Sequence, residues 1–90
     1  MDFSDALQNL KSGFPMRRSG WNGKGMFIYL VPANNYPATT EVAKRYWGEN
    51  SFVPYGAYIA MKTAQANVVP WLCSQTDMLA NDWEMEQSNG

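Results

Sequence analysis

The 90-residue sequence contains no histidine and one cysteine, and these two scarcities limit its chemistry. Histidine is the commonest general base and metal ligand, so its absence argues against ordinary acid–base catalysis and against a zinc site. Cys73 cannot form an intrachain disulfide, and no histidine is present to activate its thiol as a nucleophile. We therefore expect a protein of a reducing compartment that uses no metal or cofactor and is not an enzyme.

Positive charge and long apolar segments are also scarce. Seven Lys and Arg residues face eight Asp and Glu residues, and basic residues occur at most in pairs. Long nucleic acids and anionic membranes both select for a positive patch, so neither is an expected partner. No apolar run approaches the roughly 20 residues of a membrane-spanning helix, and the first 12 residues do not resemble a secretory signal. We expect a soluble cytoplasmic protein with a small ligand.

Aromatic residues, in contrast, are abundant. The chain has four Trp, five Tyr and four Phe. A domain of this length buries only about 60–65% of the surface of its unfolded chain, so some of these rings must stay partly exposed, in a site or at a subunit interface. Formation of an oligomer is one way to bury them.

Periodicity and turn residues predict a single α+β domain over residues 1–90, with a mostly antiparallel β-sheet and two or three short helices. Helices are expected over residues 3–12, 40–48 and 74–82. Strands are expected over residues 14–19, 26–31, 57–62, 67–72 and 83–87. The segments predicted to be loops are 33–40 and 49–56, and residues 88–90 are expected to fray.

Local signals within these elements give more specific expectations. The continuous apolar run "MFIYLV" predicts that the strand over residues 26–31 is fully buried. Pro70 lacks a backbone N–H and therefore places its strand at an edge or an end of the sheet. Ser74, with the acidic Asp77 three residues later, is typical of a capping box at the start of a helix.

The segment "GWNGKGM", which begins at Gly20, places three glycines around one tryptophan. Asn22-Gly23 favours a type I′ hairpin turn, in which both central residues have positive φ. This turn leaves Gly20 and Gly25 unexplained, and extra glycines indicate a bulge or the close approach of a partner. Neither the dinucleotide-binding fingerprint nor the KH-type loop fits the glycine order and the following strand. Trp21 is either a clasp over the hairpin or a platform for a ligand.

A second polar segment, "PWLCSQTDMLANDW", begins at Pro70 and passes from a strand into the predicted third helix. The free N–H groups at the start of that helix could bind a phosphate, or could simply be capped by Ser74 and Asp77. The charge of Asp77 would repel a phosphate. A carboxylate suits ribose hydroxyls or a base edge better, with phosphates near Lys24, an arginine or backbone amides.

Together, "GWNGKGMFIYLVP" and "MKTAQANVVPWLCSQTDMLANDW" resemble a small phage-encoded family, long catalogued as a domain of unknown function, that includes the second type of Thoeris anti-defence protein. The resemblance extends from "FSDALQNLKSG" to "DWEM", and nothing is carried over for residues 33–56, where members differ most. It implies a cytosolic phage protein that sequesters, without cleavage, the cyclic ADP-ribose-type signal of the Thoeris system. In some relatives the ligands extend to cyclic oligonucleotides of the CBASS system. A homo-oligomer is also implied, with a homotetramer as the expected form and pockets between subunits.

By position in the matching motifs, the resemblance assigns ligand binding to nine residues, and the role of each is our inference from its chemistry. Trp21 and Trp71 would stack on bases. Gly25 would let the ligand approach the backbone, and Lys24 would offset phosphate charge. Polar contacts would come from Asn22, Ser74, Gln75, Thr76 and Asp77.

Two other functions stay open on the sequence. One is a protein-binding module that inhibits a host protein directly through exposed aromatic residues. The other is an enzyme that acts on a nucleotide or sugar through carboxylates distant in sequence. Capture of a stoichiometric host protein would favour the first, and chemical change of an added nucleotide would favour the second.

Overall fold

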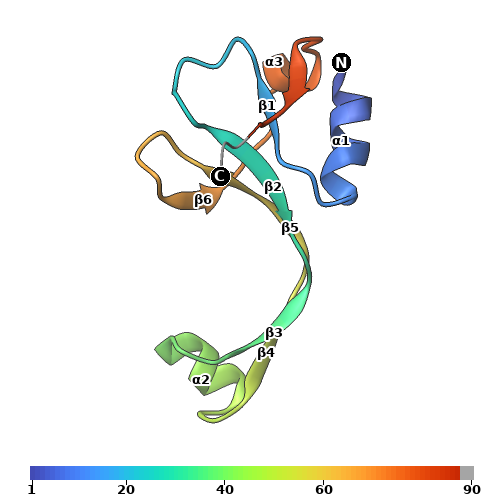
Figure 1. The fold of residues 1–90 in the computed structure, drawn as a ribbon. Helices are drawn as coiled ribbons and strands as arrows, with labels where there is room; N and C mark the ends of the chain where they lie inside the picture. Colours follow the sequence, from blue (N-terminus) through green and yellow to red (C-terminus); the bar gives the residue numbers. More distant parts are fainter. Residues whose placement is uncertain (88–90) are drawn as a thin grey trace.

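The computed structural model describes residues 1–87, which form three helices and seven strands (Figure 1). The elements are α1 (Phe3–Lys11), β1 (Met16–Arg18), β2 (Phe27–Val31), β3 (Asn34–Pro37), α2 (Glu41–Trp47), β4 (Phe52–Tyr55), β5 (Tyr58–Lys62), β6 (Val68–Pro70), α3 (Gln75–Met78) and β7 (Trp83–Met85). All the strand pairs are antiparallel, which confirms the predicted α+β class. The expected frayed tail, residues 88–90, lies outside the described residues.

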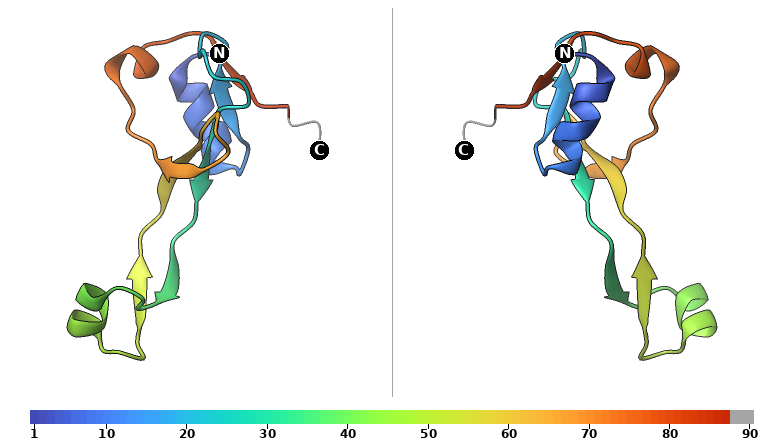
Figure 2. Two further views of the ribbon diagram at one scale, coloured as in Figure 1. Left: turned by 90° about the vertical axis from the view of Figure 1, so that its left-hand side faces the viewer. Right: turned by 90° about the vertical axis from the view of Figure 1, so that its right-hand side faces the viewer.

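Five strands form one sheet in the order β6-β5-β2-β1-β7, and α1 packs against one face of it (Figures 1 and 2). We call these five strands with α1 and α3 the head. Its core consists of Ala6 and Leu10 from α1 together with Met16, Ile28 and Trp83 from the sheet, all at most 1% exposed. Each fully buried large apolar side chain of this kind stabilises the fold by about 1.5–3 kcal/mol, so the α1–sheet contact holds the head together.

Local capping signals determine where α1 and α2 begin, and both helices lie where the sequence predicts them. The Asp2 side chain accepts a hydrogen bond from the Asp5 N–H (3.0 Å), and α1 is followed by Gly13 at a φ of 94°. In α2 the Thr40 hydroxyl accepts from the Ala43 N–H (3.0 Å), and Gly48 ends the helix at a φ of 108°. These helices therefore follow from short-range hydrogen bonding at their ends.

The third helix is shorter than predicted, and only half of its capping box forms. The Ser74 hydroxyl accepts from the Asp77 N–H (3.0 Å), but α3 ends at Met78 rather than at residue 82. In a full capping box the Asp77 side chain would also accept from the backbone N–H of Ser74. Here the Asp77 carboxylate instead accepts from Arg18 and from the Trp21 indole. A charged donor forms a stronger hydrogen bond to a carboxylate than a backbone N–H does, so the contact with the strand prevails over the cap.

The prediction of a fully buried strand over residues 26–31 is wrong. Ile28 is buried, whereas the other residues of β2 are half-buried, including Tyr29 and Leu30. Successive side chains of a strand point to opposite faces of the sheet, and α1 covers one face only. The apolar run therefore marks the central strand of the sheet rather than a strand enclosed on both faces.

The predicted type I′ turn at Asn22-Gly23 is also wrong. Residues 19–26, which we call the glycine loop, connect β1 to β2, and positive φ in this loop occurs at Gly25 (72°) rather than at the Asn22-Gly23 pair. The two strands pair through Met16 and Ile28, too far from Asn22 for a two-residue turn. The loop is instead attached to the C-terminal part of the chain, where the Ser19 N–H donates to the Asp82 carbonyl (3.1 Å).

Residues 32–57, which we call the arm, project from the head as a two-stranded ribbon that carries α2 (Figure 2). The predicted loops over residues 33–40 and 49–56 are wrong, because they contain β3 and β4. Val31 pairs with Tyr58, and Asn34 with Tyr55 three positions further along both strands, so β3 and β4 keep the register of β2 and β5. Pro32 and Gly56 interrupt the ribbon, which explains why the strand pattern is hidden in the sequence.

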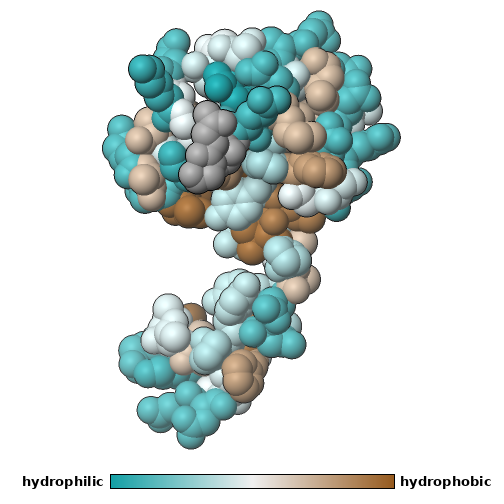
Figure 3. Space-filling model, viewed as in Figure 1, coloured by the Kyte–Doolittle hydropathy of each residue, from teal (hydrophilic) through white to brown (hydrophobic). Residues whose placement is uncertain are grey.

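The arm gives the molecule its elongated shape. The extents are 45 × 26 × 26 Å and the radius of gyration is 15.7 Å, against about 12 Å for a compact chain of this length. A narrow neck separates the arm from the head, and hydrophobic surface gathers on the head beside this neck (Figure 3). The buried residues of the arm are Ala38, Ala43 and Val53, a core of small side chains.

The β5–β6 hairpin agrees with the sequence. Its turn lies at residues 63–67, where the Thr63 N–H donates to the Asn67 carbonyl (2.9 Å), and Ala66 has a positive φ of 67°. β6 is an edge strand, as Pro70 predicts. No helix within residues 1–87 is long and apolar enough to cross a membrane.

Candidate ligand-binding site

The structure brings together the two segments that the sequence proposes as one pocket. The Trp21 indole of the glycine loop donates to Asp77 Oδ1 of α3 (3.3 Å) and packs edge-on against Trp83, with ring centroids 5.4 Å apart. Trp71, just after β6, reaches the same cluster, with ring centroids 6.1 Å from Trp83 and 6.2 Å from Phe3. The Trp21 ring therefore leaves its own hairpin and packs on the C-terminal segment, and Trp21 and Trp71 are both half-buried.

Charged groups fasten the glycine loop to the C-terminal segment, and we call Arg18, Asp77 and Asp82 the Arg18 network. Arg18 Nη1 donates to Asp77 Oδ1 (2.8 Å) and Arg18 Nε donates to Asp82 Oδ1 (2.7 Å). The Gly20 N–H donates to the second Asp82 oxygen (2.9 Å). Arg18 and Asp77 have side chains that are 17% and 15% exposed, so their ion pair is largely shielded from water, whereas the Asp82 side chain is 31% exposed.

The network keeps both carboxylates charged. Burial raises the pKa of Asp77, but hydrogen bonds from Arg18, Trp21 and Ser74 oppose it, and the pKa of Asp77 lies below its ordinary value. The hydrogen bond from Arg18, with that from the Gly20 N–H, lowers the pKa of Asp82 despite some desolvation. The two carboxylates in turn raise the pKa of Arg18. The Arg18 guanidinium therefore pairs with two carboxylates, which leaves the network with a net negative charge at neutral pH.

Contacts within the chain account for the three glycines of the loop. A Cβ atom at Gly20 would lie 2.9 Å from an Asp82 carboxylate oxygen, and one at Gly23 would overlap the Met26 side chain. Gly25 has positive φ, and its carbonyl accepts from Lys62 Nζ (3.0 Å). The positive φ of Gly25 favours glycine, and neighbouring side chains lie close to Gly20 and Gly23, whether or not a ligand approaches the backbone.

The remaining predicted site residues lie on the surface. Asn22, Lys24, Gln75 and Thr76 are exposed, as is Ser74, whose hydroxyl caps α3. The four-residue length of α3 favours ordinary capping over phosphate binding at its start. Apolar side chains stand next to these polar groups: Leu72, Met78 and Leu79 are 90%, 50% and 76% exposed.

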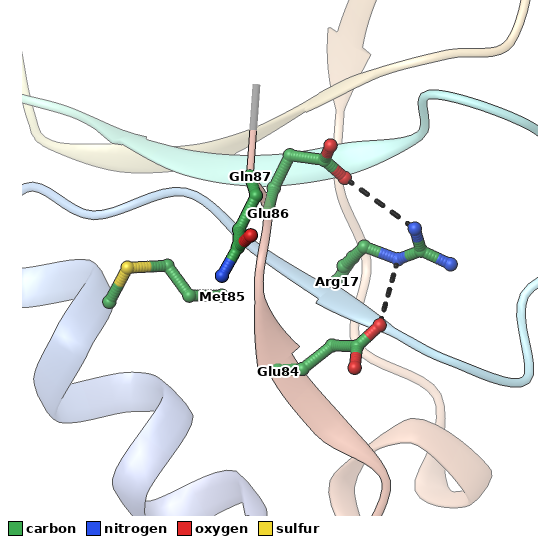
Figure 4. A pocket seen from close by; sticks show the side chains of 5 residues that line it. All are labelled: Arg17, Glu84, Met85, Glu86 and Gln87. Carbon is green, nitrogen blue, oxygen red and sulfur yellow. Dashed lines mark ion pairs between the residues drawn. The ribbon is translucent and has the colours of Figure 1, made fainter. Parts of the chain in front are cut away.

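The predicted site residues do not line three surface depressions found within residues 1–87. The largest, about 400 Å³, is bordered by residues of β1 and of the chain around β7, namely Arg17, Glu84, Met85, Glu86 and Gln87 (Figure 4). The Arg17 guanidinium points toward Glu84 and Glu86, at 3.5 and 3.9 Å, whereas Met85 points away from it. The other two, about 260 and 210 Å³, lie on the arm around Arg45. Acidic side chains and an already paired arginine make the largest depression unsuited to a phosphate.

Other reactive groups offer little chemistry in the described part of the chain. Burial, with a smaller contribution from Asp77, raises the pKa of the half-buried Cys73 thiol, so it stays protonated and weakly nucleophilic at neutral pH. Within residues 1–87, no three His, Cys, Asp or Glu side chains are grouped so as to hold a metal ion. The arrangement is suited to stacking and hydrogen bonding.

Sequence reasoning missed three residues that organise this site: Arg18, Asp82 and Trp83. Arg18 and Asp82 are 64 positions apart, so no local motif joins them. The signal that could have found them is strand pairing, because Trp83 lies directly opposite Arg18 where β7 pairs with β1.

Comparison with known proteins agrees with the resemblance carried by the two segments. The model of the Thoeris anti-defense 2-like domain family matches residues 1–85. The chain is also 40% identical over 86 residues to a protein of Bacillus phage SP01 named Thoeris anti-defense 2, and the alignment covers 94% of this chain and 93% of that relative. Glycine loop, aromatic cluster and Arg18 network all fall inside the matched range.

Proposed function

The chain belongs to the Thoeris anti-defense 2-like domain family, and from this premise we propose that it is a phage protein that counters Thoeris defence in the cytoplasm of an infected bacterium. We propose further that it binds and sequesters the cyclic ADP-ribose-type signal without cleaving it, so that the Thoeris effector is not activated. Cyclic oligonucleotides are a second ligand class within the same proposal.

The observation that carries the proposal is that Trp21 and Trp71 both pack on Trp83, and that the Trp21 indole also donates to the Asp77 carboxylate. Both indoles are half-buried and so combine a fixed position with an accessible edge or face. Stacking of a base on an aromatic ring contributes about 1–3 kcal/mol. Asp77 Oδ1 accepts from Arg18 and Trp21, which fixes the direction of the carboxylate. The Asp77 side chain keeps 15% of its surface exposed, and a carboxylate is suited to accept ribose hydroxyls.

Positive charge for the phosphates comes from two lysines beside the glycine loop. Lys24 is exposed on the loop itself, and Lys62 of β5 donates to the Gly25 carbonyl (3.0 Å). Two ammonium groups can balance the pyrophosphate of an ADP-ribose-type ligand without an extended basic patch. This arrangement selects a small anion rather than a long nucleic acid.

We also propose that the active form is a homo-oligomer, with a homotetramer as the expected size and pockets between subunits. The predicted site residues line none of the three depressions described above for a single copy. Large side chains on the arm are at least 41% exposed: Tyr36, Tyr46, Trp47, Phe52 and Tyr55. These rings expose on the order of 500 Å² of aromatic surface, against the roughly 800 Å² that each partner buries in a stable interface.

Capture and release of the ligand test the binding proposal. Purified protein is incubated with a cyclic ADP-ribose isomer, separated from free nucleotide, and heated until it unfolds. The expected result is a nucleotide of unchanged mass and retention time in the released fraction, with depletion of the free pool before heating. Release of a cleaved or otherwise altered nucleotide would contradict sequestration and favour an enzyme.

Substitution of Trp71 tests the site itself. Trp71→Leu keeps an apolar side chain against Phe3 and Trp83 but removes the stacking surface, so binding should weaken about 10- to 100-fold by calorimetry. Phe14→Ala, which removes a 45% exposed ring elsewhere on the head, is the control and should bind as wild type does. Unchanged affinity in the Trp71 variant would exclude stacking at this position.

The exposed rings of the arm also favour a second candidate, a module that binds and inhibits a host protein. Native mass spectrometry of protein purified from the host separates the candidates. A homo-oligomer with retained nucleotide supports sequestration, and a stoichiometric complex with a host protein and no nucleotide supports the module.

A further inference from the structure

We propose that Arg18 is a positioning residue of the nucleotide pocket: it does not touch the ligand, but it holds the glycine loop against α3 and fixes the direction of the Asp77 carboxylate. The effect on affinity rests on the proposed function, whereas the positioning itself follows from the geometry of one protein chain and can be tested without ligand.

Arg18 is placed to join three segments that are distant in sequence. It ends β1, and its guanidinium lies between Asp77 of α3 and Asp82 just before β7, with donor–acceptor distances of 2.8 and 2.7 Å. The two bonds leave from different nitrogens, Nη1 and Nε, so both carboxylates are held in the plane of one guanidinium. A lysine could pair with either carboxylate but could not reproduce this fork.

Each of the two carboxylates also accepts a hydrogen bond from the glycine loop. Asp82 accepts from the Gly20 N–H (2.9 Å) with its second oxygen, and its carbonyl accepts from the Ser19 N–H (3.1 Å). Asp77 Oδ1 accepts from both Arg18 and the Trp21 indole. The start of the loop and the direction of the Trp21 ring therefore depend on one cation, and without it two carboxylates would repel each other inside the same cluster.

The charged and titratable groups around Asp77 define what loss of Arg18 would do. They are Arg18 from β1, Asp82 from the segment before β7, and the Cys73 thiol just before α3. Only Arg18 among them is positive. Burial raises the pKa of Asp77, so removing Arg18 should bring protonation of this carboxylate toward neutral pH.

Arg17 provides a matched control. It is the preceding residue of β1, carries the same charge, and points to the opposite face, where it pairs with Glu84 and Glu86 at 3.5 and 3.9 Å (Figure 4). Its side chain is 32% exposed. Loss of an arginine from β1 at this position should leave the loop, Asp77 and Trp21 as they are.

The first experiment reads the positions of the loop groups without ligand. The NMR signals of the Trp21 indole N–H and the Gly20 amide are followed in wild type, Arg18→Gln, Arg18→Lys and Arg17→Gln. In Arg18→Gln we expect both protons to exchange with water at least about 10-fold faster, as for a local hydrogen bond weakened by more than 1.4 kcal/mol. Arg18→Lys should keep part of the wild-type protection against exchange, and Arg17→Gln should keep all of it. Unchanged protection in Arg18→Gln overturns the positioning role.

The second experiment measures binding affinity as a function of pH. A general loss of stability would not change this pH dependence while the protein stays folded. Calorimetric titration with a cyclic ADP-ribose isomer at 15 °C, where the folded state is checked by circular dichroism, should give wild-type binding that is level between about pH 5 and 8. In Arg18→Gln, binding should be about 10-fold weaker at pH 8 and weaken further as Asp77 protonates on lowering the pH. Affinity within twofold of wild type across this range overturns the inference.

Two precautions keep the outcomes distinct. If Arg18→Gln does not fold, Asp82→Asn weakens one arm of the fork without leaving two carboxylates unbalanced, and it should show the same losses at smaller size. If wild-type protein binds no cyclic nucleotide, the proposed function is refuted together with the effect of Arg18 on affinity. The exchange data still decide whether Arg18 positions the loop.

Discussion

At the scale of single residues, the arrangement of charge around Asp77 and Asp82 has the largest consequence. Two carboxylates close to one guanidinium stay ionised because the hydrogen bonds of Arg18 favour their charged forms, and the pKa of each lies below its ordinary value. In the unfolded chain both acids return to a pKa of about 3.9. The difference in pKa links the folded state to proton concentration.

Acid should therefore weaken the fold through these two residues. A carboxylate with a lowered pKa binds fewer protons in the folded state, so its contribution is complete above about pH 5 and is lost as pH falls through its folded pKa. We expect wild-type protein to lose stability between about pH 5 and 3, and Asp77→Asn with Asp82→Asn to lose less over that range. Urea titrations at a series of pH values measure both slopes, and equal slopes would contradict the prediction.

The same residues show what the sequence can predict of a site. "GWNGKGM" and "PWLCSQTDM" place Trp21, Trp71 and Asp77 in two polar segments, and the structure brings the segments together. The ionic contact that joins them was not predictable, because Arg18 and Asp82 are separated by most of the chain and meet only through sheet pairing. Three glycines suggest a ligand in sequence, yet neighbouring side chains already account for them.

At the scale of elements, the turn between β5 and β6 stands out for its backbone. Ala66 has a φ of 67°, a conformation that costs an L-residue roughly 1 kcal/mol more than glycine. Ala66 is exposed and is not part of the head core, so its backbone conformation can be improved without changes in core packing.

Replacement of Ala66 with glycine should stabilise the protein. The free energy gained by relieving the left-handed conformation exceeds the cost of the greater conformational entropy that glycine gives the unfolded chain. We therefore expect the free energy of unfolding to rise by about 0.5 kcal/mol. Ala64→Gly, two positions earlier in the same turn and without positive φ, is the control and should be neutral or destabilising. Denaturant midpoints of the two variants give the comparison, and a loss of stability in Ala66→Gly would contradict it.

Elements with local signals were predicted, and elements that depend on distant partners were not. Caps at Asp2 and Thr40 place α1 and α2 correctly, since both ends of each contact lie within one turn. The sequence NNYP of β3 and the proline within FVPY of β4 favour loops, and these segments form strands because β2 and β5 set their register. Arg18 and Trp21, by drawing Asp77 away from its cap, account for the missing half of the capping box.

At the scale of the whole molecule, the arm exposes more apolar surface than a chain of this size ordinarily leaves in water. Val42 and Tyr46 on α2 are 75% and 78% exposed, and the core beneath them consists of two alanines and a valine. Such a small core contributes little to holding α2 against β4. Contact with another copy would supply the missing burial, in line with the proposed oligomer.

Charge placed on this surface should dissociate the oligomer. Val42→Lys combined with Tyr46→Lys puts two ammonium groups where apolar contact is expected, and dissociation should shift to at least about 100-fold higher protein concentration. Sedimentation velocity over a dilution series measures the shift. Gln8→Lys, on the exposed side of α1, is the matched control and should sediment as wild type does. A wild-type protein that is monomeric at high micromolar concentration would contradict the role of the arm.

The unbroken register between head and arm has an evolutionary consequence. Val31 and Tyr58 are paired partners, so the chain leaves the head and returns to it at a single point. An insertion or deletion within residues 32–57 that changes the length of both strands equally leaves every pair of the five-stranded sheet in place. This segment can therefore change in length without a change in the tryptophans or the Arg18 network, all of which lie outside residues 32–57.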